Sequence, residues 1–156
     1  MDKIYPREKL KKKIDALRGE GKKIVFTNGC FDILHVGHTR YLRDAKRQGD
    51  VLVLGLNSDE SVRSLKGEKR PLTPENERAD ILASLESVDY VTIFPELTPL
   101  TLIEYLQPHV LVKGGDWKRA SIVGADLVKS VVRIPVVKGR STTALIKKIV
   151  ALHGQR

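Results

Sequence analysis

Two histidines that bracket a glycine stand in the most chemically suggestive stretch of the chain. Residues 27–38 read Thr-Asn-Gly-Cys-Phe-Asp-Ile-Leu-His-Val-Gly-His, so His35 and His38 are close enough to face one ligand. Their spacing is not that of a zinc protease, and a single cysteine excludes a multi-cysteine zinc site. Two imidazoles at a helix start suit phosphoryl oxygens, because phosphoryl transfer needs positioning and electrostatic stabilisation. One histidine could instead pack and the other cap a helix, but the pair together favours chemistry.

The residues on either side place this stretch at a strand-to-helix crossover. Residues 22–26 form a short apolar run typical of a buried strand, and apolar residues then recur at helical spacing until Gly49. A helix start offers free N–H groups and a partial positive charge, which suits phosphate. Gly37 would let a ligand approach the backbone where a Cβ would block it. Cys30 has no identifiable base partner, so we do not expect it to be a nucleophile.

Composition narrows the class of protein. The 156 residues are 41% hydrophobic and 30% charged, which indicates one domain with a substantial core. The apolar runs are too short to cross a membrane, and the charged N-terminus lacks a signal-peptide core. One cysteine excludes an internal disulfide framework. We therefore expect a cytoplasmic protein. The net charge of +9 is scattered and aromatics are only 5%, so we expect neither a nucleic-acid nor a membrane partner.

Strands and helices alternate along the sequence. We predict a helical lead-in over residues 1–21, containing a helix at 7–18, before the main domain at 22–156. Strands are predicted at residues 22–26, 50–56, 89–94, 110–113 and 131–137. This alternation predicts an α/β fold, a Rossmann-like doubly wound five-stranded parallel sheet in a single domain. Pro135 cannot donate to a ladder, which places the fifth strand at an edge.

The helical segments carry specific packing expectations. Thr73 and Pro74 should start a helix that turns its apolar side chains inward, namely Ile81, Leu82, Leu85 and Val88. Residues 121–130 are predicted as a short helix. A final amphipathic helix over residues 141–152 should bury Leu145, Ile146, Ile149 and Leu152.

Four polar segments follow predicted strands and should converge on one crevice, because ligands bind at the carboxyl ends of strands in such folds. They are residues 27–38, 57–59, 113–117 and 138–143. Ser141 or Thr142 would cap the last helix, and capping is compatible with binding phosphate there.

The motifs resemble a known family. Gly29-Cys30-Phe31-Asp32 followed by His35-Val36-Gly37-His38 resembles the signature of the cytidylyltransferase-like nucleotidyltransferases, and Gly139-Arg140-Ser141-Thr142-Thr143 resembles their second element. These enzymes transfer a nucleoside monophosphate from a nucleoside triphosphate to a phosphate or phosphorylated alcohol. Over about residues 22–150 the chain most resembles the adenylyltransferase domain of ADP-heptose synthases. The resemblance implies AMP transfer from ATP to D-glycero-β-D-manno-heptose 1-phosphate, a step toward the lipopolysaccharide core.

The resemblance also implies residue roles. His35 and His38 stabilise the α-phosphate, with His38 expected to have the larger effect on rate, and Lys66 either folds over the triphosphate or stays an exposed lysine. Nucleotide contacts are expected from Thr27, Asn28, Gly29, Phe31, Lys113, Gly115, Asp116, Arg140, Ser141, Thr142 and Thr143. Acceptor contacts are expected from Asp32, Asn57, Arg78 and Trp117. The plainer alternatives are that Asn57 caps a helix, Arg78 pairs with Glu75, and Trp117 covers the core.

Cofactor and partner expectations follow from the same resemblance. Mg²⁺ would be held mainly by the ATP phosphates, with no protein ligands, and the protein would form a homodimer. Glycerol-3-phosphate cytidylyltransferase and FAD synthetase are alternatives within the class. A non-catalytic nucleotide- or RNA-binding module is an alternative of another class.

Overall fold

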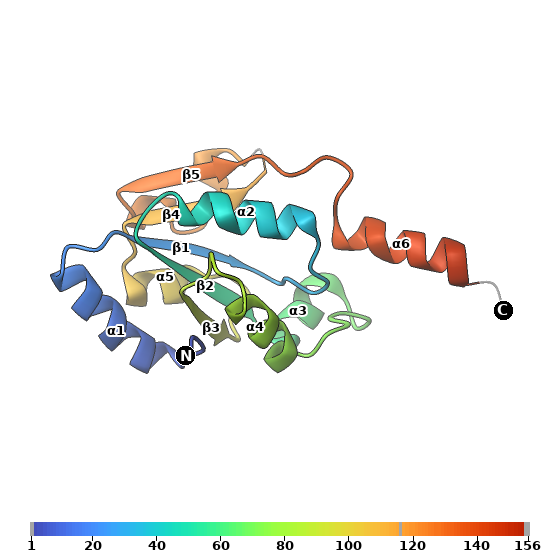
Figure 1. Ribbon diagram of the computed structural model, residues 1–156, viewed down its shortest axis with the longest axis horizontal. Helices are drawn as coiled ribbons and strands as arrows, with labels where there is room; N and C mark the ends of the chain where they lie inside the picture. The colour runs from blue at the N-terminus through green and yellow to red at the C-terminus, as the bar shows by residue number, and fades with distance from the viewer. Residues whose placement is uncertain (1, 116, 155–156) are drawn as a thin grey trace.

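The computed structural model describes residues 2–115 and 117–154 and contains a parallel sheet with helices on both faces (Figure 1). Its strands are β1 (Ile24–Gly29), β2 (Val51–Asn57), β3 (Tyr90–Phe94), β4 (Val110–Gly114) and β5 (Ser130–Ile134), in the order β3-β2-β1-β4-β5. The helices are α1 (Arg7–Gly19), α2 (Val36–Lys46), α3 (Asp59–Lys66), α4 (Glu75–Ala83), α5 (Leu100–Leu106) and α6 (Thr142–His153). The predicted doubly wound fold is confirmed, and β5 lies at an edge as Pro135 indicated.

Alternate residues of the central strands enter two separate cores. Ile24 and Phe26 of β1 pack with α1 and α5, whereas Val25 packs with α2 and α4 on the opposite face. Every residue of β2 is buried. Because helices cover both faces, these strands are continuous apolar runs rather than alternating ones.

The N-terminal segment joins the same core as the rest of the chain. Val91 of β3 donates its N–H to Lys3 O and accepts from Tyr5 N, so the segment extends the outer edge of β3. Leu10 and Ile14 of α1 are fully buried against the sheet. Helix α1 therefore covers the helix predicted at residues 7–18 and packs on the same core as the strands.

Local backbone chemistry shortened two predicted elements. The strand predicted to reach residue 137 ends at Ile134, directly before Pro135. The helix predicted over 121–130 is wrong, since only two 3-10 turns form, η1 (Arg119–Ser121) and η2 (Ala125–Leu127). Gly124 between them has φ +82°, and a Cβ there would come within 2.8 Å of the Ile103 side chain. The left-handed backbone conformation of Gly124 interrupts the helix at that point.

The inward face of α4 is rotated relative to the prediction. Arg78, Ala79 and Leu82 are buried, whereas Ile81 is 46% exposed. The helix starts at Glu75 with Pro74 as its N-cap, one residue later than predicted. The prediction assigned only apolar residues to the inward face of the helix. It therefore placed Ile81 inside and did not foresee that Arg78 would be buried there.

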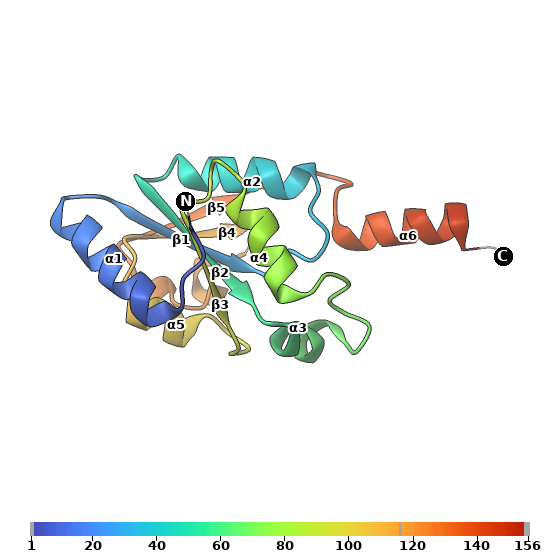
Figure 2. The same ribbon diagram turned by 60° about the horizontal axis from the view of Figure 1, so that its bottom comes forward.

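The last helix differs most from the prediction. No residue of α6 is buried, and Ile149 and Leu152 are 49% and 66% exposed. Figure 2 shows α6 projecting beyond the end of the sheet. The apolar periodicity gave the helix correctly but not the burial of its apolar face. Among the helices described, none has both the length and the apolar character needed to span a bilayer.

Candidate functional site

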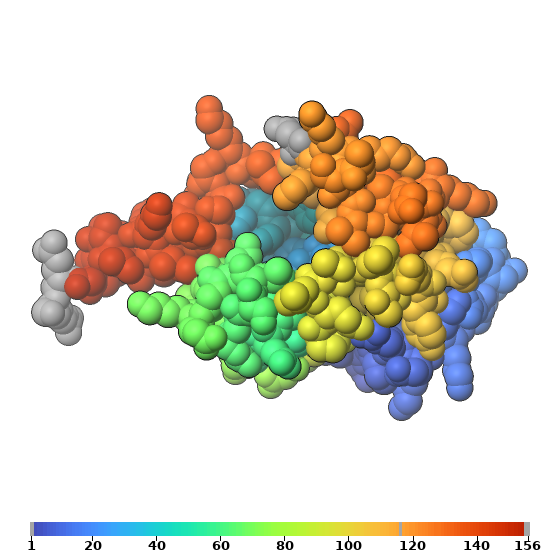
Figure 3. All heavy atoms as spheres, turned by 180° about the vertical axis from the view of Figure 1, so that it is seen from behind, coloured from blue at the N-terminus to red at the C-terminus, as the bar shows by residue number. Residues whose placement is uncertain are grey.

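The crevice opens where β1 and β4 diverge. These two central strands pair only at Val25–Val110 and Phe26–Leu111, whereas β1 stays paired with β2 as far as Gly29. The chain order reverses at this point, which is where doubly wound sheets bind ligands. Figure 3 shows a hollow with a blue-to-teal floor, ringed by α3 and its following loop, the yellow and orange segments, and α6.

Thr27 and Tyr41 hold the base of this crevice together. Thr27 is fully buried, its hydroxyl lies 2.6 Å from the Tyr41 hydroxyl, and both oxygens lie 3.1 Å from Val112 O. Burial raises the pKa of Tyr41 to about 12, so the phenol stays protonated. Thr27 therefore joins β1 to α2 and β4 from beneath the crevice. The sequence analysis did not select Tyr41 as a site residue. Its position about one helical turn after His38 could have indicated that the two side chains lie on the same face of the helix.

Asn28 and Lys113 face each other across the opening. Lys113 Nζ donates to Asn28 Oδ1 at 2.7 Å, and burial lowers the pKa of Lys113. Gly115 adopts φ +88° and donates its N–H to Ile134 O, which turns the chain at the end of β4. Asp116, also predicted to contact the nucleotide, lies outside the described residues.

His35 caps the helix that carries His38. Its Nδ1 accepts from Gly37 N at 3.1 Å, so the neutral ring carries its proton on Nε2 and can donate there. A Cβ on Gly37 would lie 2.8 Å from the His35 ring. The glycine therefore makes room for this ring, a function that the sequence did not suggest. Burial, together with the charge of Arg140, lowers the pKa of His35.

His38 is held between two rings. Its imidazole stacks on His35 with a centroid separation of 3.9 Å, and the Phe31 ring lies 5.2 Å away on centroids. Phe31 adopts φ +45° and folds its ring over Gly29, where a Cβ would come within 2.9 Å. Burial first, and then the nearby His35, lower the pKa of His38 to about 4. Its buried Nδ1 has no hydrogen-bond partner among the described atoms.

The start of α6 lies against the start of α2. Ser141 caps α6 by accepting from Ala144 N, and Thr142 Oγ1 donates to Ile33 O at 3.1 Å. A shallow pocket between the two helix starts is lined by His35, Arg140 and Ser141 among others. The Ser141 hydroxyl can still donate and that of Thr142 can still accept. Thr143, in the first turn of α6, is exposed.

Asp32 holds a loop instead of facing the crevice. Its carboxylate accepts from Leu72 N and Thr73 N and forms an ion pair with Arg70 at 2.6 Å. Burial would raise the pKa of Asp32, but these hydrogen bonds outweigh it and hold the pKa below its usual range. With its side chain fully buried, Asp32 ties the loop after Lys66 to the histidine segment.

Arg78 is a structural residue, which corrects the sequence-based expectation. It is 1% exposed, and its guanidinium donates to the carbonyls of Thr73, Cys30 and Asn57 and pairs with Asp59. The expected surface ion pair with Glu75 is wrong, and the donors are committed to the chain rather than to a phosphate. Arg78 thus joins the ends of β1 and β2, a role that only a contact between distant segments reveals.

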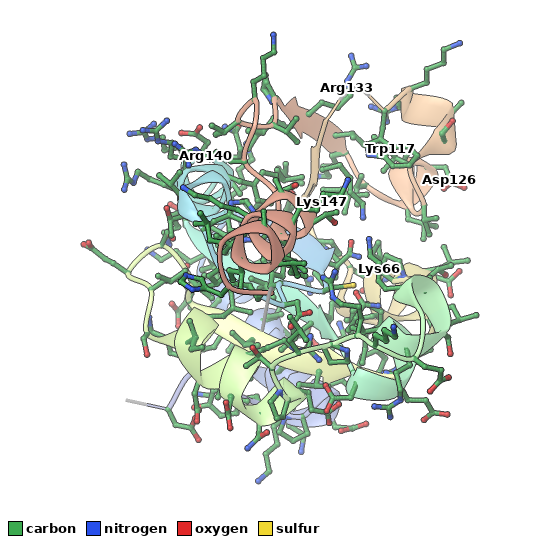
Figure 4. The ribbon with its side chains drawn as sticks, turned by 90° about the vertical axis from the view of Figure 1, so that its right-hand side faces the viewer. Lys66, Trp117, Asp126, Arg133, Arg140 and Lys147 are labelled. Atoms are coloured by element: carbon green, nitrogen blue, oxygen red, sulfur yellow. The ribbon has the colours of Figure 1, made fainter. Side chains whose placement is uncertain are left out.

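The remaining predicted residues differ in how exposed they are. Asn57 is buried and donates to Ser61 Oγ, while Ser58 rather than Asn57 caps α3. Trp117 is 57% exposed, so the alternative that it covers the core is wrong. Figure 4 shows Lys66 at the end of α3, on the other side of the gap from Trp117. Burial raises the pKa of the Cys30 thiol, which keeps this residue protonated and poorly nucleophilic.

This arrangement is suited to phosphates. Two helix starts, two neutral imidazoles and the cations of Arg140 and Lys148 meet at one edge of the sheet. Among the described residues, no group of three or more His, Cys, Asp and Glu side chains could hold a metal ion. The fold and site together define the nucleotidyltransferase class of enzymes.

Comparison with known proteins gives the family. The cytidylyltransferase-like model matches residues 26–149, and the chain belongs to this family. It is 62% identical to the bifunctional protein HldE of Geobacter metallireducens and 55% identical to that of Syntrophotalea carbinolica, matching 91% and 98% of this chain. The chain spans only 30% and 32% of those relatives. A lipopolysaccharide core biosynthesis protein from Thermoplasma volcanium is 29% identical, with a TM-score of 0.65 over 76% of this chain and all of that one.

Proposed function

We propose that the protein transfers AMP from ATP to D-glycero-β-D-manno-heptose 1-phosphate, giving ADP-heptose and pyrophosphate. The observation that carries nucleotidyl transfer is the stacked, neutral pair of His35 and His38 beside the start of α6. The choice of acceptor is supported by the resemblance to ADP-heptose synthases, by the HldE relatives, and by the name of the Thermoplasma protein.

The chemistry requires no protein nucleophile. An oxygen of the sugar phosphate, already anionic, forms a bond to the α-phosphorus of ATP. The bond from that phosphorus to the bridging oxygen of pyrophosphate breaks, and its electron pair leaves with pyrophosphate. The enzyme therefore has to align the groups and stabilise the charge on the phosphoryl oxygens.

The two imidazoles supply neutral hydrogen-bond donors at the α-phosphate. His35 holds its proton on Nε2 because Gly37 N occupies Nδ1. His38 has a pKa of about 4, so it is neutral at neutral pH. Donors fixed in place before reaction stabilise developing charge without reorganisation.

The other contacts divide between the nucleoside and its phosphates. Arg140, Ser141, Thr142 and Thr143 would hold the β- and γ-phosphates at the start of α6, with Lys66 closing from the opposite rim. The ends of β1 and β4 would hold the nucleoside, through Asn28, Gly29, Phe31, Lys113 and Gly115. The exposed Trp117 would contact the acceptor.

Mg²⁺ fits this site only as part of the substrate. The polar side chains that line the phosphate pocket are those of His35, Arg140, Ser141 and Lys148, a donor set that binds phosphate oxygens directly. Bound through the triphosphate, Mg²⁺ would offset negative charge during transfer.

A homodimer in the cytoplasm completes the proposal. A second copy of the chain is supported by the apolar side chains of α6, which the rest of the chain does not cover. Val150 is 60% exposed to solvent and Leu152 is 66% exposed. Supporting the location, ATP and sugar phosphates are cytoplasmic substrates.

A panel of substrates tests the reaction. ATP and CTP would each be combined with heptose 1-phosphate, glycerol 3-phosphate and FMN, with pyrophosphate release as the readout. We expect turnover with ATP and heptose 1-phosphate well above every other pair. Preference for CTP with glycerol 3-phosphate, or ATP with FMN, would contradict the proposed acceptor. Salt-sensitive RNA binding without pyrophosphate release would contradict the enzyme class.

A further inference from the structure

The pocket between the starts of α2 and α6 contains a lysine outside the recognised motifs. Its lining includes His35, Arg140 and Ser141, and also Leu145 and Lys148 from farther along α6. Ser141, Leu145 and Lys148 lie at positions i, i+4 and i+7, so they share one face of the helix. We propose that Lys148 binds the terminal phosphate of the triphosphate and holds the pyrophosphate product, extending the phosphate site beyond the helix start.

The charge of the pocket supports an anionic ligand. Arg140 and Lys148 form no ion pair with any described carboxylate, and none of the described residues lining the pocket is acidic. The α6 sequence itself has no aspartate or glutamate. Two unneutralised cations beside a helix start attract an anion that carries several charges.

The geometry places Lys148 at the far end of such a ligand. Seven residues of helix rise about 10 Å, and helical side chains lean toward the N-terminus, so the Lys148 ammonium reaches back along α6 toward Ser141. Arg140 packs beside the first turn of α2, where its Cβ would lie 3.6 Å from a Cβ on Gly37. A triphosphate starting at the imidazoles would therefore pass Arg140 and Ser141 before it meets Lys148.

This placement gives Lys148 a defined part in the reaction. Negative charge accumulates on pyrophosphate as its bond to the α-phosphorus breaks, and a cation at its far end stabilises that charge. The same contact would slow release of the product. Lys147 is a matched control because it has the same charge, lies on the same helix and does not line the pocket. Figure 4 looks along α6 and shows Lys147 and Arg140 on different sides of the helix.

The test compares Lys148→Ala with Lys147→Ala and Lys148→Arg. Pyrophosphate binding is measured by calorimetry, and the KM for ATP by pyrophosphate release at saturating acceptor. We expect Lys148→Ala to raise both the pyrophosphate Kd and the ATP KM about tenfold, the low end for a charge-assisted contact. Lys147→Ala should change either by less than about twofold, as for an exposed charge, and Lys148→Arg should keep most of the binding.

The outcomes separate this inference from the proposed function on which it rests. The pocket contact would be contradicted if Lys148→Ala and Lys147→Ala change the pyrophosphate Kd equally, or if Lys148→Ala does not change it. Either result would count even if turnover is normal. Loss of pyrophosphate binding in Lys148→Ala alone would support the contact, and it is measurable without turnover. If the wild-type protein binds pyrophosphate through Lys148 but turns over no pair of substrates, the result would support the phosphate contact and contradict the proposed reaction.

Discussion

The imidazole rings of His35 and His38 stack 3.9 Å apart on centroids, and both pKa values lie below that of a free histidine. Two charged rings at this separation would repel each other, and burial adds to the cost of charging either one. The pair is therefore neutral at neutral pH. In the proposed reaction their N–H groups would donate hydrogen bonds to phosphoryl oxygens rather than transfer a proton.

Replacing His38 by alanine should lower turnover without unfolding the protein. A donor fixed at developing charge is worth about 10²–10³ in kcat, so we expect a loss of that size. Pyrophosphate release gives the rate, and circular dichroism with thermal unfolding gives the fold. A variant with normal turnover would show that His38 does not contact the reacting phosphate.

The neutral histidines predict a dependence of stability on acid. The pKa of His38 is lowered from 6.5 to about 4, so the unfolded chain binds a proton more readily than the folded one between those values. The free energy of unfolding should therefore be undiminished above pH 6.5 and fall as the pH drops toward about 4. Urea unfolding across this range measures it. The same curve for His38→Asn should be flatter there, and identical curves would contradict the buried neutral state.

Adding a methyl group at Gly37 should act through His35. The new Cβ would lie 2.8 Å from the His35 ring, so Gly37→Ala must displace the imidazole. Turnover should fall in this variant. In a His35→Ala background the methyl group has no ring to displace, so the double variant should be no slower than His35→Ala alone. Additive losses in kcat would mean that Gly37 instead contacts the ligand.

Arg78 should matter more for stability than for substrate affinity. Replacing it by methionine leaves Asp59 and the carbonyls of Cys30 and Asn57 without their donor. Breaking a buried charge network in this way costs about 3–5 kcal/mol of unfolding free energy. Chemical denaturation measures the loss, with exposed Arg63→Met as the control. An intact stability together with a raised KM would support the phosphate contact expected from the sequence.

Local sequence patterns predicted most of the elements. Continuous apolar runs identified the buried strands, and helical spacing identified the helix at residues 7–18, which the structure has at Arg7–Gly19. Such patterns depend on neighbouring residues alone. The errors at residues 121–130 and at Ile81 have a different origin. Gly124 packs against the side chain of Ile103, and buried Arg78 bonds to the carbonyl of Cys30, so both conformations depend on distant parts of the chain.

The sequence by itself determined the class of fold, the order of the strands along the chain, and the two motifs that indicate the family. Only the tertiary structure decided that Asp32 and Arg78 hold the loops of the site, because Asp32 contacts residues 38 to 41 positions away and Arg78 reaches a carbonyl 48 positions away. It also placed Lys148 beside His35 in one pocket. Periodicity assigns a side chain to a face of its helix, but what meets that face depends on how distant elements pack.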